Sequence, residues 1–319
     1  MNRIMIIDAL NLFLRSYIVN PTMSKGGHPI GGTAGFIKSL QKLTREINPT
    51  SIVICWDGQG GSRKRKQQNK NYKEGRSPVR LNRDIRVLSE QQEKENKIWQ
   101  MHRILEYLNN FPVIQLMADE VEADDLISYV CRYSNFAEDQ KVIVSSDKDF
   151  YQLLDNTTVL HRPIQNTFLT KHNIIEEYGI HPQNFALARA IAGDKSDNLE
   201  GIPGVGLKTI AKRFPFLGEE RDVTISEVVE FAANQESKIK AFSAIIEGEE
   251  LIKGNYDLMQ LYSPSLSYQA KQRVDWSIKE FNYSFNKTNT DLMLLEDGLN
   301  ENNWFELFQN FRRMCKKQG

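Results

Sequence analysis

The stretches E-V-E-A-D-D-L-I-S-Y-V at 120–130 and K-V-I-V-S-S-D-K-D-F at 141–150 decide how this chain folds. Apolar residues recur at helical spacing in the first stretch, which predicts a helix that opens at Glu122 and runs to Cys131. The apolar side of that helix would be Leu126, Ile127 and Val130. In the second stretch, the β-branched run 141–145 predicts a short buried strand.

Five carboxylates in this region lie at the boundaries of the two predicted elements: Glu122, Asp124, Asp125, Asp147 and Asp149. The first three have an ordinary explanation, because acids in the first turn of a helix complement its dipole. That explanation does not cover the last two, which follow the strand at its carboxyl end. Open α/β sheets bind their ligands at that end. The region therefore predicts a ligand site, and the dipole explanation stays open for the helix acids.

Two other short apolar segments, 3–7 and 51–56, are also predicted strands, and they end in Asp8 and Asp57. Strands that alternate with helices indicate an α/β fold with a central, mostly parallel sheet flanked by helices. One aspartate after a strand is ordinary turn chemistry. Aspartates after three such strands would lie along one edge of the sheet, and we interpret them as a site.

Composition restricts the class of protein. The chain has 319 residues, of which 26% are charged, and 41 Lys and Arg balance 41 Asp and Glu. Overall neutrality neither requires nor excludes a nucleic-acid partner, because the segregation of the two signs decides that. The three cysteines have no metal-ligand spacing, and we find neither a secretory signal nor an apolar run near the ~18 residues of a membrane span. We therefore expect an intracellular, cytoplasmic protein.

The segment 63–86 is strongly basic, with ten basic residues, two acids and a local charge of +8. The basic residues are Arg63, Lys64, Arg65, Lys66, Lys70, Lys73, Arg76, Arg80, Arg83 and Arg86. Such a composition usually means a solvated, partly disordered loop. Its place directly after the strand that ends at Asp57 favours instead a segment that binds phosphates and becomes ordered on its ligand.

Most remaining segments are predicted as framework. The glycine-rich segment 26–35 lacks the G-x-x-x-x-G-K-[ST] pattern of a phosphate cradle, so we predict a plain loop before a helix at 36–47. A strand is predicted at 112–116, after a helix with core positions Ile98, Met101, Ile104, Leu105 and Leu108. Segment 263–290 is polar and has no predicted element. The aromatic stripe at 304–311 is interpreted as a helix face in the core rather than as a partner surface.

A second informative stretch, A-G-D-K-S-D-N-L-E-G-I-P-G-V-G-L-K-T-I-A-K at 192–212, follows a predicted helix at 182–192. Asp194 and Asp197 are three residues apart, so both can point the same way. Glycines then allow a tight hairpin with bare backbone amides at a basic helix start. The glycines are Gly201, Gly204 and Gly206, and the helix start contains Lys208, Thr209 and Lys212. This arrangement predicts a sequence-independent grip on a DNA backbone.

Six motifs, in order along the chain, resemble those of the 5′-nuclease family, which comprises flap endonucleases, bacteriophage 5′-exonucleases and the N-terminal domain of bacterial DNA polymerase I. The motifs are M-I-I-D-A-L-N-L-F-L-R-S-Y, I-C-W-D-G, N-Y-K-E-G-R, E-A-D-D-L-I, S-S-D-K-D-F-Y-Q-L-L and G-D-K-S-D-N-L-E-G-I-P-G-V-G-L-K-T-I. The resemblance implies an α/β nuclease core at 1–180, with a basic helical arch at about 62–98. It also implies a helical DNA-binding subdomain at 181–319, with a helix–three-turn–helix (helix–hairpin–helix-like) motif at 193–214 and a C-terminal extension.

Nine carboxylates are predicted to converge on one cleft: Asp8, Asp57, Glu122, Asp124, Asp125, Asp147, Asp149, Asp194 and Asp197. So many acids would repel one another and take up protons unless cations were present. Oxygen-only ligand sets suit Mg²⁺, with Mn²⁺ as a substitute. The resemblance implies two such ions. The first would be served by Asp8, Asp57, Glu122, Asp124 and Asp147, and the second by Asp149, Asp194 and Asp197, with Asp147 or Asp125 near both. A K⁺ bound by backbone carbonyls of the hairpin at 201–212 is also implied.

The resemblance assigns roles to four basic residues. Lys73 and Arg76 match arch residues that approach the scissile phosphate, and Arg15 matches the arginine beside the first aspartate. All three would be catalytic, by stabilising the charge of the transition state. Arg65 is assigned to DNA binding. The implied activity is 5′–3′ exonuclease or flap endonuclease hydrolysis in DNA replication or repair, including RNase H-type removal of RNA primers.

The implied substrates are DNA with a 5′ flap, a nick or a primer-bearing duplex, and RNA–DNA hybrid. A single-strand binding protein or a sliding clamp is the implied protein partner. We expect a monomer with no membrane partner, in the cytoplasm of a bacterial or phage-infected cell. Two other interpretations stay open: a non-catalytic DNA-junction-binding protein, and a PIN-like RNA endonuclease. A missing carboxylate would have favoured the first, and the glycine hairpin argues against the second.

Overall fold

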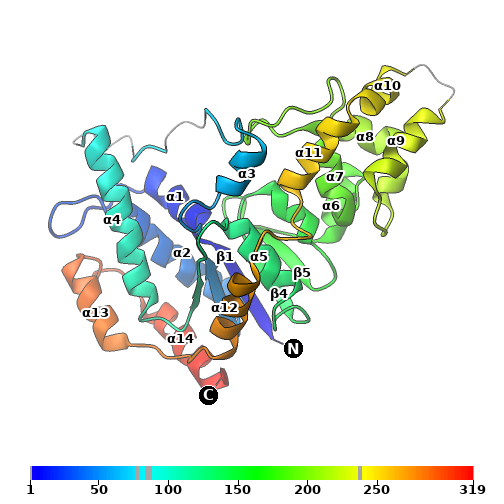
Figure 1. Ribbon diagram of the computed structural model, residues 1–319. Coiled ribbons are helices and arrows are strands. Elements are labelled where there is room, and N and C mark those ends of the chain that lie inside the picture. Colours follow the sequence, from blue (N-terminus) through cyan, green and yellow to red (C-terminus); the bar gives the residue numbers. More distant parts are fainter. Residues whose placement is uncertain (1, 76–78, 83–87, 236–238, 319) are drawn as a thin grey trace.

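One mixed sheet of six strands forms the centre of the structure, a computed structural model that describes residues 2–75, 79–82, 88–235 and 239–318 (Figure 1). The strand order is β3-β2-β1-β4-β5-β6, and all neighbours are parallel except β5 and β6. The strands are β1 (Arg3–Asp8), β2 (Ser51–Cys55), β3 (Ile114–Leu116), β4 (Gln140–Val144), β5 (Thr158–Arg162) and β6 (Thr167–Leu169). The predicted α/β fold with a mostly parallel sheet is confirmed.

The central strand, β1, is buried on both faces of the sheet, between β2 and β4. Ile4 and Ile6 pack into the core on one face, whereas Met5 and Ile7 pack into the core on the other. None of the four side chains is exposed. A strand covered on both sides requires a continuous apolar run, which is what this segment of the sequence has.

Helices cover both faces of the sheet (Figure 1). The face of Met5 and Ile7 is covered by α1 (Ala9–Val19), α2 (Gly31–Ile47), α4 (Glu90–Leu108), α13 (Lys287–Glu296) and α14 (Phe305–Gln318). The opposite face is covered by α5 (Ala123–Arg132), η1 (Lys148–Leu153) and α7 (Pro182–Ala192). That core continues into α6 (Lys171–Tyr178), α8 (Leu207–Arg213), η2 (Pro215–Gly218), α9 (Ile225–Ala233), α10 (Lys240–Glu247), α11 (Glu249–Met259) and α12 (Tyr268–Lys279). The short helix α3 (Arg63–Gln68) opens the basic segment and has no buried residue.

The plain loop predicted at 26–35 is wrong in its second half, because α2 begins at Gly31. A Cβ on Gly31 would lie 1.9 Å from the carbonyl oxygen of Asn20, and a Cβ on Gly35 would lie 2.3 Å from the Oγ of Ser16. These glycines therefore allow α2 to lie directly against α1 and the residue that follows it. Clustered glycines usually indicate a loop, and here close helix packing overrides that rule.

We expect Gly31→Ala to lower the free energy of unfolding by about 1–3 kcal/mol, because the added methyl group would have to displace backbone atoms rather than a flexible side chain. Urea unfolding followed by circular dichroism measures this. Gly254→Ala is the matched control, since Gly254 is also helical and a Cβ there would meet nothing within 4 Å. Equal stability of the two variants would contradict the close-packing explanation.

Several other expectations differ from the structure in detail. The C-terminal stripe is confirmed as core at Leu307 and Phe311, which are fully buried, and is wrong at Phe305, which is 67% exposed. Ile98, expected in the core, is 55% exposed. The polar segment 263–290 contains α12 and the start of α13, which its composition did not predict. Among the described helices, none has the length and apolar character needed to cross a membrane.

Candidate active site

A cavity of about 170 Å³ lies at the carboxyl ends of β1, β2 and β4, and most of the polar side chains that line it are acidic. The lining residues are Asp8, Leu10, Asn11, Leu14, Asp57, Lys73, Ala123, Asp124, Asp147, Asp149 and Asp197. Six of the nine predicted carboxylates therefore lie together. The three parallel strands, the first turn of α5 and the loop after α7 position them.

The aspartates at the strand ends also accept hydrogen bonds from backbone N–H groups at the starts of helices. Asp8 accepts a hydrogen bond from the backbone N–H of Asn11 in α1 (3.1 Å). Asp147 accepts one from the N–H of Asp149 at the start of η1 (2.9 Å), and Asp57 accepts one from the N–H of Ala123 at the start of α5 (2.8 Å). The same side chains thus stabilise helix starts and form the site, and the two explanations are not alternatives.

Burial and mutual repulsion disfavour the charged forms of these carboxylates. Burial is the main reason that the pKa of Asp8 is raised to about 7, and the charges of Asp57 and Asp147 add to it. Burial, and then Asp147, also raise the pKa of Asp149 to about 7. The pKa of Asp124 is raised well above its ordinary value, again first by burial and then by Asp147. A cation in the cavity would relieve this repulsion.

A second group of carboxylates adjoins the first. One oxygen from each of Asp149, Asp194 and Asp197 lies within 4.8 Å of the others, which is close enough for the three to share a metal ion. The guanidinium of Arg189 contacts Asp149 (3.0 Å) and also Asp194. Arg189 is not among the predicted site residues, although a lone arginine within the apolar segment F-A-L-A-R-A-I-A (185–192) was a signal that could have found it.

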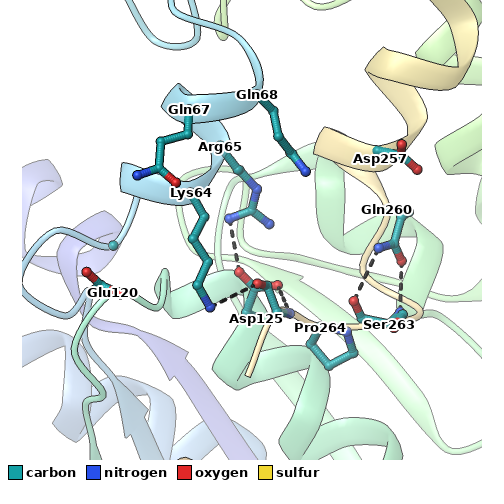
Figure 2. A pocket seen from close by; sticks show the side chains of 12 residues that line it. Lys64, Arg65, Gln67, Gln68, Glu120, Asp125, Asp257, Gln260, Ser263 and Pro264 are labelled. Carbon is teal, nitrogen blue, oxygen red and sulfur yellow. Dashed lines mark hydrogen bonds and ion pairs between the residues drawn. The ribbon is translucent and has the colours of Figure 1, made fainter. Parts of the chain in front are cut away.

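Glu122 and Asp125, at the start of α5, contact basic residues of the arch. Glu122 forms ion pairs with Nζ of Lys73 (2.8 Å) and Nη1 of Arg65 (2.6 Å), and Asp125 forms one with the same Arg65 nitrogen (3.0 Å). Asp125 lines a separate, larger cavity of about 620 Å³ together with Lys64 and Arg65 (Figure 2). The prediction that all nine carboxylates share one cleft therefore does not hold for Asp125, nor for Glu122, which does not line the carboxylate cavity because Lys73 and Arg65 bind it.

Arg65, predicted to bind DNA, is held inside the protein in this structure. Its side chain is only 12% exposed, and its Nε donates a hydrogen bond to the carbonyl of Leu258 (3.0 Å) while Nη1 binds the two acids of α5. The guanidinium thus joins α3 to both α5 and α11. Arg65 also lines the larger cavity, and its contact with DNA stays a prediction.

The three predicted catalytic residues have different positions. Lys73 lines the cavity, and although burial alone would lower its pKa, the carboxylates of Glu122 and Asp124 raise that pKa above the ordinary value. Arg76 lies outside the described residues. Arg15 lies on α1 one turn beyond Asn11, does not line the cavity, and has a buried Nη1 without a hydrogen-bond partner in the described part of the chain.

The glycine loop between α7 and α8 adjoins the carboxylates through a cavity of about 410 Å³. Asp147, Arg189 and Asp194 line this cavity, as does Leu207, the first residue of α8. Asp147, at the end of β4, and the first residue of α8 therefore line the same cavity.

Within that loop, glycine is required at two of the predicted positions. A Cβ on Gly201 would lie 2.1 Å from the carbonyl carbon of Ala192, and Gly204 has a φ of +76°. Gly206 precedes α8, on which Lys208 and Lys212 are exposed and Thr209 is half-buried. Of α8, only Leu207 lines the cavity, and the contact of these glycines, lysines and Thr209 with DNA stays a prediction.

Comparisons with known proteins reveal relatives of this chain. Residues 3–179 match the family model of the 5′-3′ exonuclease N-terminal, resolvase-like domain. The chain is 32% identical over 213 residues to a 5′-3′ exonuclease of Buchnera aphidicola subsp. Schizaphis graminum (strain Sg), which covers 65% of this chain and 67% of the relative.

Two solved structures share the fold. One is bacteriophage T5 5′-exonuclease with bound zinc ions, with a TM-score of 0.69, 18% identity, and coverage of 88% of this chain and 99% of that one. The other is the bacteriophage T5 D15 flap endonuclease in a complex with DNA and metal ions, with a TM-score of 0.65, 17% identity, and coverage of 93% and 99%. At these identities the likeness concerns the fold.

Proposed function

We propose a specific reaction for this chain, which belongs to the 5′-3′ exonuclease family and is a 5′–3′ nuclease. It hydrolyses phosphodiesters at 5′ flaps, nicks and RNA-primed ends, in a way that depends on metal ions and on the structure of the substrate. The observation that carries the proposal is the cavity lined by six carboxylates and Lys73 at the carboxyl ends of three strands. A non-catalytic junction binder would have no need to collect acids whose pKa values are raised first by burial and then by one another.

The donor set of the site fits hard divalent cations. The candidate ligands are the carboxylate oxygens of aspartates, and Mg²⁺ and Mn²⁺ prefer oxygen ligands in proteins. Asp8, Asp57, Asp124 and Asp147 would hold one ion, and Asp149, Asp194 and Asp197 would hold a second. When bound, two such ions supply an activated water and stabilise the leaving oxygen of a phosphodiester.

The residues of the chain itself bind and orient the substrate. Lys73 places a positive charge at the cavity, where it would stabilise the negative charge that develops on the phosphate. The exposed lysines of α8 and the amides of the glycine loop would hold the backbone of the downstream duplex, with a K⁺ at the loop carbonyls. The basic segment 63–86 would contact the unpaired 5′ strand.

The finer assignments belong to the same proposal. We assign the nuclease core to 1–180 and the DNA-binding subdomain, with its helix–hairpin–helix-like motif, to 181–319. The bacteriophage T5 enzyme with DNA and metal ions supports a DNA substrate by likeness of fold. RNA–DNA hybrid as a further substrate, a single-strand binding protein or sliding clamp as a partner, and a monomeric state complete the proposal.

Cleavage of a 5′-labelled flap duplex tests the function. We expect cuts near the junction with Mg²⁺ or Mn²⁺ and no cuts with EDTA. We also expect cutting to be lost when a bulky group blocks the 5′ end, because a blocked strand cannot pass through the arch. Parallel digestion of RNA–DNA hybrid and single-stranded RNA defines the substrate range. Tight flap binding without cleavage in any metal would refute the nuclease and favour the junction binder.

A further inference from the structure

The loop that follows α7 is closed on itself by two backbone hydrogen bonds. The N–H of Asp194 donates to the carbonyl of Leu199, and the N–H of Leu199 donates to the carbonyl of Asp194, both at 2.8 Å. The side chains of Asp194 and Asp197 belong to the second carboxylate group. Between them and the close of the loop, Asn198 has a left-handed backbone with a φ of +57°. This loop (194–199) is called the acidic loop below.

The base of the arch is bound to the acidic loop at two points. The side-chain amide of Asn198 donates a hydrogen bond to the carbonyl of Asn71 (3.0 Å), and the N–H of Lys73 donates one to the carbonyl of Asp197 (2.9 Å). Lys73 also has a left-handed backbone, with a φ of +57°. A side chain as large as lysine rarely adopts this conformation unless its surroundings hold it there.

A small apolar cluster supports these two contacts. Tyr72, between the two bonded residues of the arch, is only 3% exposed and packs with Leu199, Leu258 and Met259. Its hydroxyl donates a hydrogen bond to Glu122 (3.4 Å), the same carboxylate that binds the ammonium of Lys73. The turn at 71–73 is therefore fixed by the acidic loop on one side and by Glu122 on the other.

We propose that Asn198 is a positioning residue that fixes the backbone of Lys73, so that the loop carrying Asp194 and Asp197 also sets where the Lys73 ammonium lies. Asparagine is suited to this position, because it tolerates the left-handed region and its amide can reach across to another loop. Without the Asn198 bond, one of the two hydrogen bonds between the turn and the acidic loop is lost, and the backbone from which the long Lys73 side chain extends is less firmly held. The proposal rests on the proposed function, since it concerns the placement of a charge for phosphodiester hydrolysis.

The variant Asn198→Gly separates the side-chain bond from the backbone conformation, because glycine adopts the same φ without strain. We expect kcat for flap cleavage to fall about fivefold to tenfold, the effect of one lost hydrogen bond, with flap affinity in EDTA unchanged. Asn48→Gly is the matched control: Asn48 also has a left-handed φ of +52°, caps α2 and lies at the opposite end of the sheet from the site. That control should leave kcat unchanged.

A double-mutant cycle with Lys73→Ala decides whether Asn198 acts through Lys73. If it does, Asn198→Gly lowers kcat by less than about twofold in the Lys73→Ala background, since the charge that it places is already gone. Equal fold losses in both backgrounds would overturn the proposal.

Amide hydrogen exchange of the metal-free protein gives a readout that does not depend on activity. We expect residues 71–75 to exchange faster in Asn198→Gly than in the parent and in Asn48→Gly, with equal global stability of the two variants. Unchanged exchange at 71–75 would overturn the positioning role, even where the parent cleaves flaps. Absence of cleavage by the parent would instead refute the proposed function, and the exchange data would still decide whether the Asn198 bond holds the turn.

Discussion

Asp147→Asn is expected to abolish flap cleavage, with a loss of at least about 10³-fold in kcat, while flap binding stays close to that of the parent. Asp147 lies at the carboxyl end of β4 and lines both the cavity of the six carboxylates and the cavity beside the glycine loop. Its charge also contributes to the raised pKa of Asp8, Asp124 and Asp149. The effect is large because this side chain adjoins both proposed ion sites.

The same variant should be more stable than the parent when metal is absent. The folded-state pKa of Asp8 and Asp149 is about 7 against an ordinary 3.8, so the folded protein holds protons that the unfolded chain releases above about pH 4. The free energy of unfolding therefore falls as the pH rises from about 4 to about 7, and it stays low at higher pH. Asparagine at position 147 removes one repelling charge and keeps an oxygen that can accept the hydrogen bond from the N–H of Asp149. The variant should therefore lose less stability than the parent as the pH rises.

Thermal melts in EDTA at pH 5.5 and pH 8 measure this effect alongside cleavage assays. Asp139→Asn is the control, because Asp139 lies next to the amino end of β4 and accepts hydrogen bonds from the backbone N–H (3.2 Å) and the side-chain amide (3.4 Å) of Asn2. It should change neither kcat nor the response of stability to pH. Normal turnover by Asp147→Asn would remove the basis for the whole site assignment.

The second large effect concerns Lys73→Ala, for which we expect about a 10²-fold loss in kcat with the fold intact. The ammonium lies at the carboxylate cavity and binds Glu122 (2.8 Å), and this carboxylate keeps Arg65 as a partner in the variant. The substitution therefore removes a positive charge from the site without leaving the buried Glu122 unpaired.

Lys73→Arg should recover part of the lost rate, because it restores the charge in a different shape. Lys287→Ala, on the exposed side of α13, serves as the control and should cleave like the parent. Single-turnover kinetics with saturating enzyme separate the chemical step from substrate binding and from product release. Equal rates for Lys73→Ala and the parent would exclude a role for this lysine in the chemical step.

Much of the fold and half of the site followed from one regularity of the sequence. Short apolar runs that end in aspartate predicted Asp8, Asp57 and Asp147 at one edge of a parallel sheet, and the register of β1 with β2 and β4 puts their carboxyl ends side by side. The regularity is reliable because strand direction and strand length alone determine where such residues lie.

The remaining site residues depend on contacts that no local pattern contains. Asp124 and Asp125 are adjacent in α5 and so point about 100° apart, and only the packing of the helix decides which of them faces the cavity. Arg189 and Asn198 interact with residues far away in the chain, and neither has a spacing that marks it. The resemblance predicts that Arg65 binds DNA, but its burial against α5 depends on tertiary packing that the motif does not contain.

The packing of α14 has a consequence for synthesis on the ribosome. Leu307 and Phe311 complete the same core as Met5 and Ile7 of the first strand, yet they are made about 300 residues later. At roughly 5–20 residues per second, the growing chain waits on the order of 15–60 s before that face of the sheet can be closed. During this interval the apolar surface of α2 that α14 covers in the finished protein stays exposed in the nascent chain. Variants that weaken α14 should therefore reduce the yield of protein from cells more than they reduce the stability of the protein once it is made.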